Sequence, residues 1–538
     1  MSANDNTLVC MTDSHKPHDS SVSQVPRLRL YDTATHQITP FTPIHPGVVG
    51  IYVCGATVQS SPHIGHIRAA VAFDVIRRWF MRLGYTVLFI RNVTDIDDKI
   101  LDKSRAAGQQ WWERAYIYER EFTHAYERLG VLAPSYEPRA TGHITDMIDL
   151  IQRILDNGHA YVVPDADGKP SGNVYFDVPS WPQYGELTHQ QAGTQAADDS
   201  AAVADKMGPS VDQHGDDKYN PVDAADLSED KHDPRDFALW KSPKATDPQT
   251  ARWKTPFGIG RPGWHLECSA MSHRYLGADF DIHGGGLDLR FPHHENEMAQ
   301  SKAAGWGFAH HWMHSAWVTA KGEKMSKSLG NGLSVDSILA EHSAWVVRYA
   351  MASVQYRSML EWGDQTLSEA ERAHERIMNF IDRADALIHT PISTDDVAAL
   401  PVTELPAEFV SSMNEDFNVS GATASIFTTI RQGNALLDGA RTPNVNSQLR
   451  ALVIQLRAML DVLGLDPLHA QWLGSDTPGD ASSQEHLALD ALIGEQLAKR
   501  AEARKNKDFA QADTIRDELG KAGIVIEDTP SGSSWSME

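Results

Sequence analysis

The sequence Asp-Ile-His-Gly-Gly-Gly-Leu-Asp-Leu-Arg-Phe-Pro-His-His-Glu-Asn-Glu, residues 281–297, is the stretch that decides the fold. It begins as an apolar strand, breaks at three successive glycines and continues as a helix behind Pro292. His293 and Glu297 are four residues apart, which places both side chains on one face of that helix. Such a pair can hold a metal ion together with ligands from elsewhere in the chain, and Cys54 and Cys268 are the soft candidates.

A surface pair is the simpler interpretation of His293 and Glu297, because His and Glu at this spacing stabilise many helices by about 0.3 kcal/mol. The three glycines favour the metal site instead. Glycine weakens a strand unless the backbone must turn sharply or approach a ligand closely. We therefore favour a site made of two Cys, one His and one Glu, which is a ligand set suited to zinc.

The chain has 538 residues and a net charge of −24, with hydrophobic residues at 41%. This length exceeds what one hydrophobic core usually serves, so we expect about three domains or more. No apolar run approaches the ~18 residues of a membrane span. The first 25 residues lack the features of a secretion signal, and three cysteines are too few for a disulfide framework. These features predict a cytoplasmic protein without a membrane partner.

Residues 191–233 contain eleven Asp and Glu against three Lys, so this segment contributes −8 to the net charge. Its Ala, Asp, Gly, Pro and Gln content cannot bury enough apolar surface to offset the entropy of ordering. We predict a disordered insertion without function. The rest of the chain is less acidic than the total suggests, which leaves room for a local surface that binds nucleic acid.

The first half of the chain predicts a βαβ unit. Residues 47–55 form a buried strand with Cys54 at its end, where open α/β sheets collect their ligands, although a buried inert thiol is the commoner case. A helix begins behind Pro62, and its first turn contains His63 and His66. A helix N-terminus favours anions, and two imidazoles there can donate to phosphate. A His-x-x-His pair alone is weak evidence, since many such pairs are structural.

A second basic segment follows the central stretch, with the sequence Lys-Gly-Glu-Lys-Met-Ser-Lys-Ser-Leu-Gly-Asn at residues 321–331. Its three lysines, Lys321, Lys324 and Lys327, lie among small residues and glycines. Lysines on a flexible segment can stabilise the charge that develops on a departing pyrophosphate. The alternative is a solvated basic turn.

Taken together, these segments resemble the two signatures of class I aminoacyl-tRNA synthetases, in the expected order: His63-Ile64-Gly65-His66 and Lys324-Met325-Ser326-Lys327-Ser328. The segments Tyr-Val-Cys-Gly (52–55), Pro-Gly-Trp-His-Leu-Glu-Cys-Ser-Ala-Met (262–271) and Phe-Pro-His-His-Glu-Asn-Glu (291–297) are similar to those of the cysteinyl-tRNA synthetase family. The resemblance extends from about Arg27 to Trp535 and leaves out the tail and the acidic insertion. At Gln59-Ser60 the chain departs from the Tyr-Asp of many relatives.

The resemblance implies an α/β fold: a Rossmann-like parallel-sheet catalytic domain with an inserted connecting domain, then a helical bundle and a small C-terminal anticodon-binding domain. It implies one zinc ion per chain, held by Cys54, Cys268, His293 and Glu297. It also implies contacts of Thr57, Trp264 and His283 with the substrate cysteine, binding of ATP, which enters with Mg²⁺ as a substrate, by His63, Gly65, His66, Asp288 and Lys327, and catalysis by His63, His66, Lys324 and Lys327.

The implied reaction is the ATP-dependent formation of cysteinyl-adenylate and transfer of the cysteinyl group to tRNA(Cys). Zinc favours a thiolate ligand over the hydroxyl of serine, whereas an apolar pocket separates such similar substrates by only ~1–3 kcal/mol. We therefore expect no editing domain, and we expect a monomer. Two alternatives stay open: a ligase that joins cysteine to a glucosaminyl-inositol acceptor, and a non-catalytic, zinc-stabilised RNA-binding protein.

The domain organisation follows from the same patterns and resemblance. The last segment, from Ile493 to Leu519, places six basic residues on a predicted helix, which suits RNA phosphates, although a solvated helix face is the simpler interpretation. We predict a disordered tail (1–26), a catalytic domain in two halves (27–140 and 256–315), a connecting domain (141–255), a loop and stem-contact region (316–365), a helical bundle (366–470) and an anticodon-binding domain (485–538).

Overall fold

The computed structural model describes residues 27–189, 228–320, 323–324, 333–388, 390–439 and 444–472, and parts of 493–537. The predicted tail and most of the predicted insertion lie outside these residues. Within the described part of the chain, no helix is both long enough and apolar enough to span a membrane.

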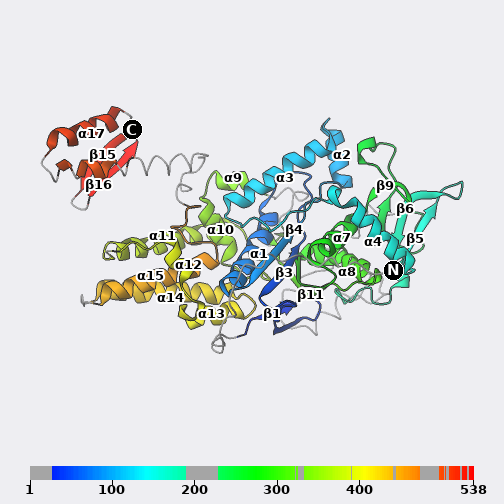
Figure 1. The fold of residues 1–538 in the computed structure, drawn as a ribbon, viewed down its shortest axis with the longest axis horizontal. Helices are drawn as coiled ribbons and strands as arrows, with labels where there is room; N and C mark the ends of the chain where they lie inside the picture. The colour runs from blue at the N-terminus through cyan, green and yellow to red at the C-terminus, as the bar shows by residue number, and fades with distance from the viewer. Residues whose placement is uncertain are drawn as a thin grey trace, which may run out of the picture.

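A four-stranded parallel sheet forms the centre of the molecule and confirms the predicted α/β fold (Figure 1). In spatial order its strands are β11 (Ala309–Ser315), β10 (Phe280–Gly286), β3 (Val48–Val53) and β4 (Thr86–Arg91). Helix α1 (Ile64–Arg82) joins β3 to β4, and α8 (Glu295–Ala303) joins β10 to β11. The chain therefore leaves β3 and β10 in opposite directions, which makes the gap between their carboxyl ends a topological switch point.

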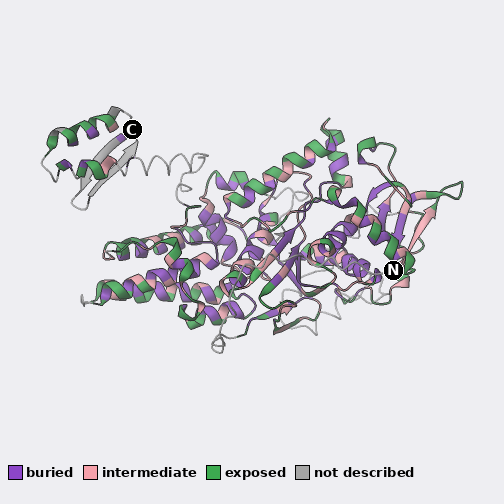
Figure 2. Ribbon diagram, viewed as in Figure 1, coloured by how far each residue is buried: buried purple, intermediate pink, exposed green. Residues whose placement is uncertain are grey.

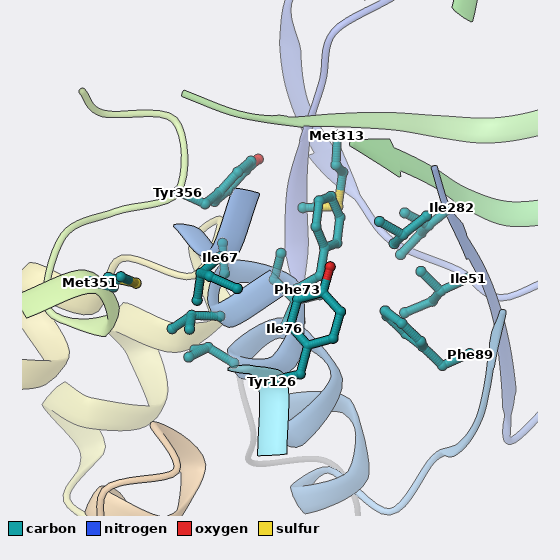
Figure 3. Packing of buried hydrophobic residues seen from close by; sticks show 14 of the residues in the cluster. Ile51, Ile67, Phe73, Ile76, Phe89, Tyr126, Ile282, Met313, Met351 and Tyr356 are labelled. Atoms are coloured by element: carbon teal, nitrogen blue, oxygen red, sulfur yellow. The ribbon is translucent and has the colours of Figure 1, made fainter. Parts of the chain in front are cut away.

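One part of the continuous hydrophobic core lies between this sheet and α1 (Figure 3). Ile51 and Ile282 from the sheet are fully buried, as is Phe73 from α1. Figure 2 shows buried residues on this sheet and its covering helices, and also on the inserted sheet and within the helical region. This packing requires glycine at position 284, because a Cβ atom there would overlap the ring of Phe73. At this position the glycine run lets α1 pack closely on the sheet.

Between the two halves of the sheet, the chain forms helices α2 (Asp98–Ala106), α3 (Trp111–Arg128) and α4 (Ile144–Asp156), and then a five-stranded antiparallel sheet. The strands of that sheet, in spatial order, are β5 (Ala160–Pro164), β6 (Pro170–Phe176), β7 (Phe237–Lys241), β9 (Gly258–Pro262) and β8 (Trp253–Thr255). Helix α7 (Trp264–Leu276) follows and leads into β10. Strands β5, β6, β7 and β8 lie within residues 141–255, the predicted connecting domain, whereas β9 lies in the residues predicted as the second half of the catalytic domain.

The last residues of the predicted insertion pack against this sheet. The His232 ring stacks on Tyr161 with centroids 3.7 Å apart, and Asn173 donates a hydrogen bond to Asp230. The packed chain therefore resumes at about residue 228, earlier than the sequence predicts, because an aromatic face and an amide within the sheet provide partners that composition cannot reveal.

The chain beyond β11 forms a small sheet and then helices. The sheet contains β12 (Val318–Ala320), β13 (Glu323–Lys324) and β14 (Leu360–Glu361). The helices are α9 (Val335–Leu339), α10 (Ala344–Ala352), α11 (Asp364–Asp385), α12 (Thr394–Ala399), α13 (Ala407–Asn414), α14 (Val419–Asp438) and α15 (Val445–Val462). Within the predicted helical bundle, residues 415–418 separate α13 from α14.

Two hairpins complete the described elements. Near the start, β1 (Arg29–Asp32) pairs with β2 (Gln37–Pro40) in an antiparallel hairpin. Near the end, α17 (Phe509–Lys521) precedes the antiparallel pair β15 (Ile524–Thr529) and β16 (Gly532–Met537).

Candidate active site and metal centre

The predicted site residues converge at the switch point of the parallel sheet. Cys54 directly follows β3, and its backbone N–H donates to the carbonyl of Gly284 on β10 at 3.0 Å. Cys268 comes from the second turn of α7, and His293 and Glu297 come from the turn that opens α8. Ligands of open α/β sheets bind at this edge, so the topology alone marks it as a candidate site.

The four predicted metal ligands lie together: one ligand atom from each falls within 4.8 Å of the others. The Sγ atoms of Cys54 and Cys268 are 3.4 Å apart, and Sγ of Cys54 is 3.3 Å from Oε1 of Glu297. Nε2 of His293 is 3.0 Å from the same carboxylate oxygen. Cys54 is partly exposed and the other three are buried, so the cluster opens toward solvent on the Cys54 side.

The charges of this cluster suit a cation. Burial raises the pKa of Cys54, as do the neighbouring Cys268 and Glu297. Burial also acts to raise the pKa of Cys268, but a hydrogen bond from Cys54 and the nearby His293 lower it to about 6. Burial opposes ionisation of Glu297 as well, yet His283 and His293 hold the pKa of this carboxyl well below its usual range. These shifts favour a carboxylate at Glu297 and a thiolate at Cys268 near neutral pH, and although burial opposes it, the same two groups raise the pKa of His293 to about 10.

His283, predicted to contact the substrate cysteine, lies fully buried behind the cluster. Its Nε2 is 3.1 Å from Oε2 of Glu297 and 3.6 Å from Sγ of Cys54, and its ring stacks on Tyr52. A second group of possible ligand atoms, from Cys54, His283, His294 and Glu297, also falls within 4.8 Å. The structure thus brings His283 to the cluster from the protein interior, where it orients Glu297.

Asn92 is a site residue that the sequence reasoning missed. Its Oδ1 accepts a hydrogen bond from the N–H of Gly55 at 2.8 Å and lies 3.5 Å from Sγ of Cys268. A Cβ atom on Gly55 would overlap the Asn92 carbonyl oxygen, so this close approach requires glycine. The sequence contains a feature that could have identified Asn92, because this residue directly follows the strand β4 just as Cys54 follows β3.

Trp264 and Thr57, predicted to contact the amino acid, are both partly exposed. The Trp264 ring stacks on His293, with centroids 4.2 Å apart and planes 28° apart. Thr57 forms a parallel bridge with Thr94, and the hydroxyl of Thr94 donates to the carboxylate of Glu267, next to Cys268. Trp264 therefore contacts a metal-ligand candidate directly, and Thr57 is connected through Thr94 to Glu267, the neighbour of Cys268.

The first signature caps helix α1. Nδ1 of His63 accepts from the N–H of Gly65 at 3.1 Å, and Nδ1 of His66 accepts from the N–H of His63 at 3.3 Å. The two rings stack with centroids 3.7 Å apart. The N–H of Ile64 donates to the carbonyl of Leu333, so the chain just beyond the second signature returns to the start of α1.

Of the remaining predicted residues, Asp288 and the backbone of Lys324 belong to the described part of the chain. Asp288 is exposed in a short 3-10 turn after β10, and its Oδ1 occupies the space beside Gly286 where a Cβ atom would come within 2.6 Å. Lys324 ends β13, and only its backbone is described. Lys321 and Lys327 lie outside the described residues.

The sheet topology, the histidine-capped helix α1 and the inserted antiparallel sheet agree with the class that the family comparison shows, the class I tRNA synthetases. Residues 40–372 match the family model of the class I tRNA synthetase (C) catalytic domain. The structure resembles methionyl-tRNA synthetase of Mycobacterium tuberculosis with methionyl-adenylate (TM-score 0.52, 16% identity, 82% of this chain and 93% of that chain). It also resembles the LeuRS–tRNA–LeuAMS complex of Agrobacterium radiobacter K84 (TM-score 0.54, 13% identity, 83% and 88%). These structures support the fold.

Comparison with sequence relatives identifies the family within this class. The chain is 67% identical to a cysteine–tRNA ligase of Bifidobacterium longum, over 98% of this chain and all of that one, and 50% identical to one of Beutenbergia cavernae, over 95% and 99%. Residues 408–468 match the DALR domain, and residues 488–535 match the cysteinyl-tRNA ligase anticodon-binding domain. The chain belongs to the cysteinyl-tRNA synthetase family.

Proposed function

We propose that this protein activates L-cysteine with ATP and transfers the cysteinyl group to tRNA(Cys), selecting its substrate through a zinc ion held by Cys54, Cys268, His293 and Glu297. The observation that supports this proposal is the convergence of these four donors within 4.8 Å at the mouth of the sheet. Two sulfurs, one imidazole and one carboxylate match the donors that zinc prefers. A bound zinc ion would take the substrate sulfur as a thiolate ligand and so discriminate against serine.

The protein's own residues position the reactants around that centre. Trp264 and Thr57 contact the amino acid on the open side of the cluster, while His283 and Asn92 orient the ligands from behind. His63 and His66 bind phosphate oxygens of ATP with Mg²⁺ at the start of α1, where the helix dipole favours anions. Asp288 hydrogen-bonds the ribose.

The chemistry requires no covalent intermediate with the enzyme. An oxygen of the cysteine carboxylate forms a bond to the α-phosphorus while the bond from that phosphorus to the pyrophosphate oxygen breaks. Lys324 and Lys327 stabilise the charge that develops on the leaving pyrophosphate. A terminal ribose hydroxyl of the RNA then attacks the carbonyl of the adenylate and releases AMP.

The predicted domain ranges, the monomeric state and the cytoplasmic location belong to the same proposal. We assign the reading of the anticodon to residues 485–538. The match of this region to an anticodon-binding domain argues against a ligase that acts on a glucosaminyl-inositol acceptor, because such an acceptor has no anticodon. The catalytic-domain match disfavours a non-catalytic RNA-binding protein.

Cysteine-dependent exchange of label between pyrophosphate and ATP tests the proposal, measured with and without tRNA, with serine as the competing substrate and with zinc determined on the same sample. We expect exchange with cysteine alone, no exchange with serine and one zinc per chain. Exchange that ran equally well with serine, or active protein without stoichiometric zinc, would contradict the proposed basis of selection.

A further inference from the structure

The junction between α13 and α14 contains an unusual backbone. Asp416 and Phe417 are consecutive non-glycine residues with φ of 53° and 51°, in the left-handed region that side chains disfavour. Both are about 1% exposed. Strained residues of this kind persist only where the surrounding structure holds them, so the partners of the junction indicate what it does.

The Asp416 carboxylate is the centre of a buried hydrogen-bond group. Its Oδ1 accepts from the N–H of Tyr31 (2.9 Å) and the hydroxyl of Tyr356 (2.8 Å). Its Oδ2 accepts from Nε2 of Gln355 (3.1 Å) and Nε of Arg357 (2.7 Å). Four donors from two separate segments therefore meet one side chain of the helical region, and three of them belong to residues 355–357.

Residues 351–357 are also held by helix α1. The Arg68 guanidinium, which is 1% exposed, donates to the carbonyls of Met351 (2.6 Å), Val354 (2.9 Å) and Gln355 (2.8 Å). Arg68 lies two residues after His66. The segment that Asp416 holds is thus attached to the helix that begins with the first signature.

The same segment supports the start of the second signature. The carbonyl of Tyr356 accepts from the N–H of Ala316 at 2.8 Å. Four residues further on, β14 pairs with β12, and the other neighbour of β12 is β13, which ends at Lys324. One short stretch, 351–360, therefore connects α1, the strand of Lys324 and the helical region.

We infer that Asp416 is a positioning residue for adenylate formation. By holding residues 355–357, it fixes the position of β12 and β13 relative to the start of α1. The inference rests on the proposed roles of His63, His66 and Lys324 in binding phosphate. Asp416 touches no substrate and acts through Tyr356 and Arg357. A small displacement of groups that stabilise a transition state lowers the rate strongly, whereas the cysteine pocket lies on other elements.

Replacing Asp416 by Ala tests the inference in the full-length protein. We expect kcat of cysteine-dependent exchange to fall about tenfold or more while KM for cysteine stays within about twofold. Asp416→Asn should recover part of kcat, because Asn tolerates left-handed φ and its Oδ1 can still accept from Tyr31 and Tyr356, whereas its Nδ2 cannot accept from Gln355 and Arg357. Equal kcat values for the wild type and Asp416→Ala would overturn the inference, as would a change confined to KM for cysteine.

Asp466→Asn is the matched control. Asp466 is also buried in the helical region, where it accepts two 3.0 Å hydrogen bonds from Arg457, and no described hydrogen bond joins it to residues 351–357. We expect it to lower the urea midpoint without lowering kcat. If both variants lost kcat in proportion to stability, Asp416 would be structural only. Absence of cysteine-dependent exchange in the wild type would instead refute the proposed function.

Discussion

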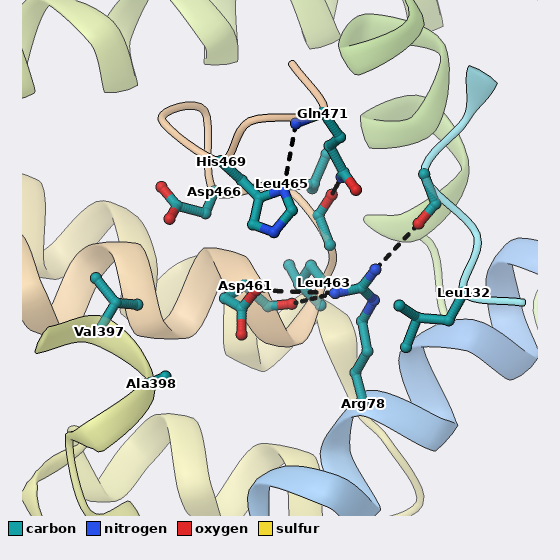
Figure 4. Close-up of polar contacts among 12 residues, drawn as sticks. Arg78, Leu132, Val397, Ala398, Asp461, Leu463, Leu465, Asp466, His469 and Gln471 are labelled. Carbon is teal, nitrogen blue, oxygen red and sulfur yellow. Dashed lines mark hydrogen bonds and ion pairs between the residues drawn. The ribbon is translucent and has the colours of Figure 1, made fainter. Parts of the chain in front are cut away.

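Replacing Asp74 by Asn should destabilise the junction between the catalytic and helical regions. The Asp74 side chain is 1% exposed on α1, and its carboxylate accepts from Nε of Arg78 at 2.8 Å and from Arg348 on α10. Figure 4 shows Arg78 reaching from α1 toward Asp461 near the end of α15. The Asp74→Asn substitution would leave the fully buried Arg348 without a counter-charge, and breaking a buried pair from one side costs about 3–5 kcal/mol.

The pH dependence of unfolding gives a second measure of how much the Asp74 carboxylate stabilises the fold. Burial acts to raise the pKa of Asp74, but Arg78 and Arg348 lower it from 3.8 to about 2. This depressed pKa corresponds to about 2 kcal/mol of stability. Because the folded-state pKa lies below the unfolded value, the contribution is complete above about pH 4 and is lost as the pH falls toward about 2. The Asn variant lacks this titration.

Urea unfolding of the wild type and Asp74→Asn, followed by tryptophan fluorescence, measures both effects. Trp79 and Trp345 are buried on the same two helices and should report on the junction. We expect a lower midpoint for the variant at pH 7 and a difference that shrinks by about 2 kcal/mol between pH 4 and pH 2. Equal midpoints at pH 7, or a difference independent of pH, would refute the reasoning.

Three further outcomes are expected. Cys268→Ser should lower both zinc content and cysteine-dependent exchange, measured by metal analysis and by label exchange, since it replaces a soft ligand with a hard one; full zinc occupancy would argue against the assignment. Deleting residues 192–226 should leave aminoacylation within a few-fold of the parent, and loss of activity in a deletion with an unchanged circular dichroism spectrum would reveal a function there. Truncation before Asp490 should retain exchange but weaken charging of tRNA and flatten the salt dependence of RNA affinity by about one unit of slope per lost phosphate contact; full-rate charging would contradict this division.

The local architecture of the site could be predicted from sequence because short-range geometry determines it. The i,i+4 spacing of His293 and Glu297 holds on the helical turn that opens α8, and α1 begins behind Pro62 as expected, although His63 is its N-cap residue and does not lie in its first turn. The position of Cys54 at the end of a buried strand placed it at the carboxyl edge of the sheet. These features depend on backbone preference and side-chain period, which neighbouring residues alone establish.

Contacts between distant segments were decided only by the tertiary structure. His283 and Cys54 are 229 positions apart, and nothing in their local sequence shows that the imidazole approaches the thiol from the interior. The junction at Asp416 depends on the same kind of contact, because its left-handed backbone is held by Tyr31 and by residues 355–357, which are distant in the sequence. Sequence by itself determined which residues could bind metal and phosphate, because chemical type and local spacing limit those roles. Which atoms meet, and which are shielded from water, depended on how the strands and helices pack, since burial and long-range pairing are properties of the whole fold.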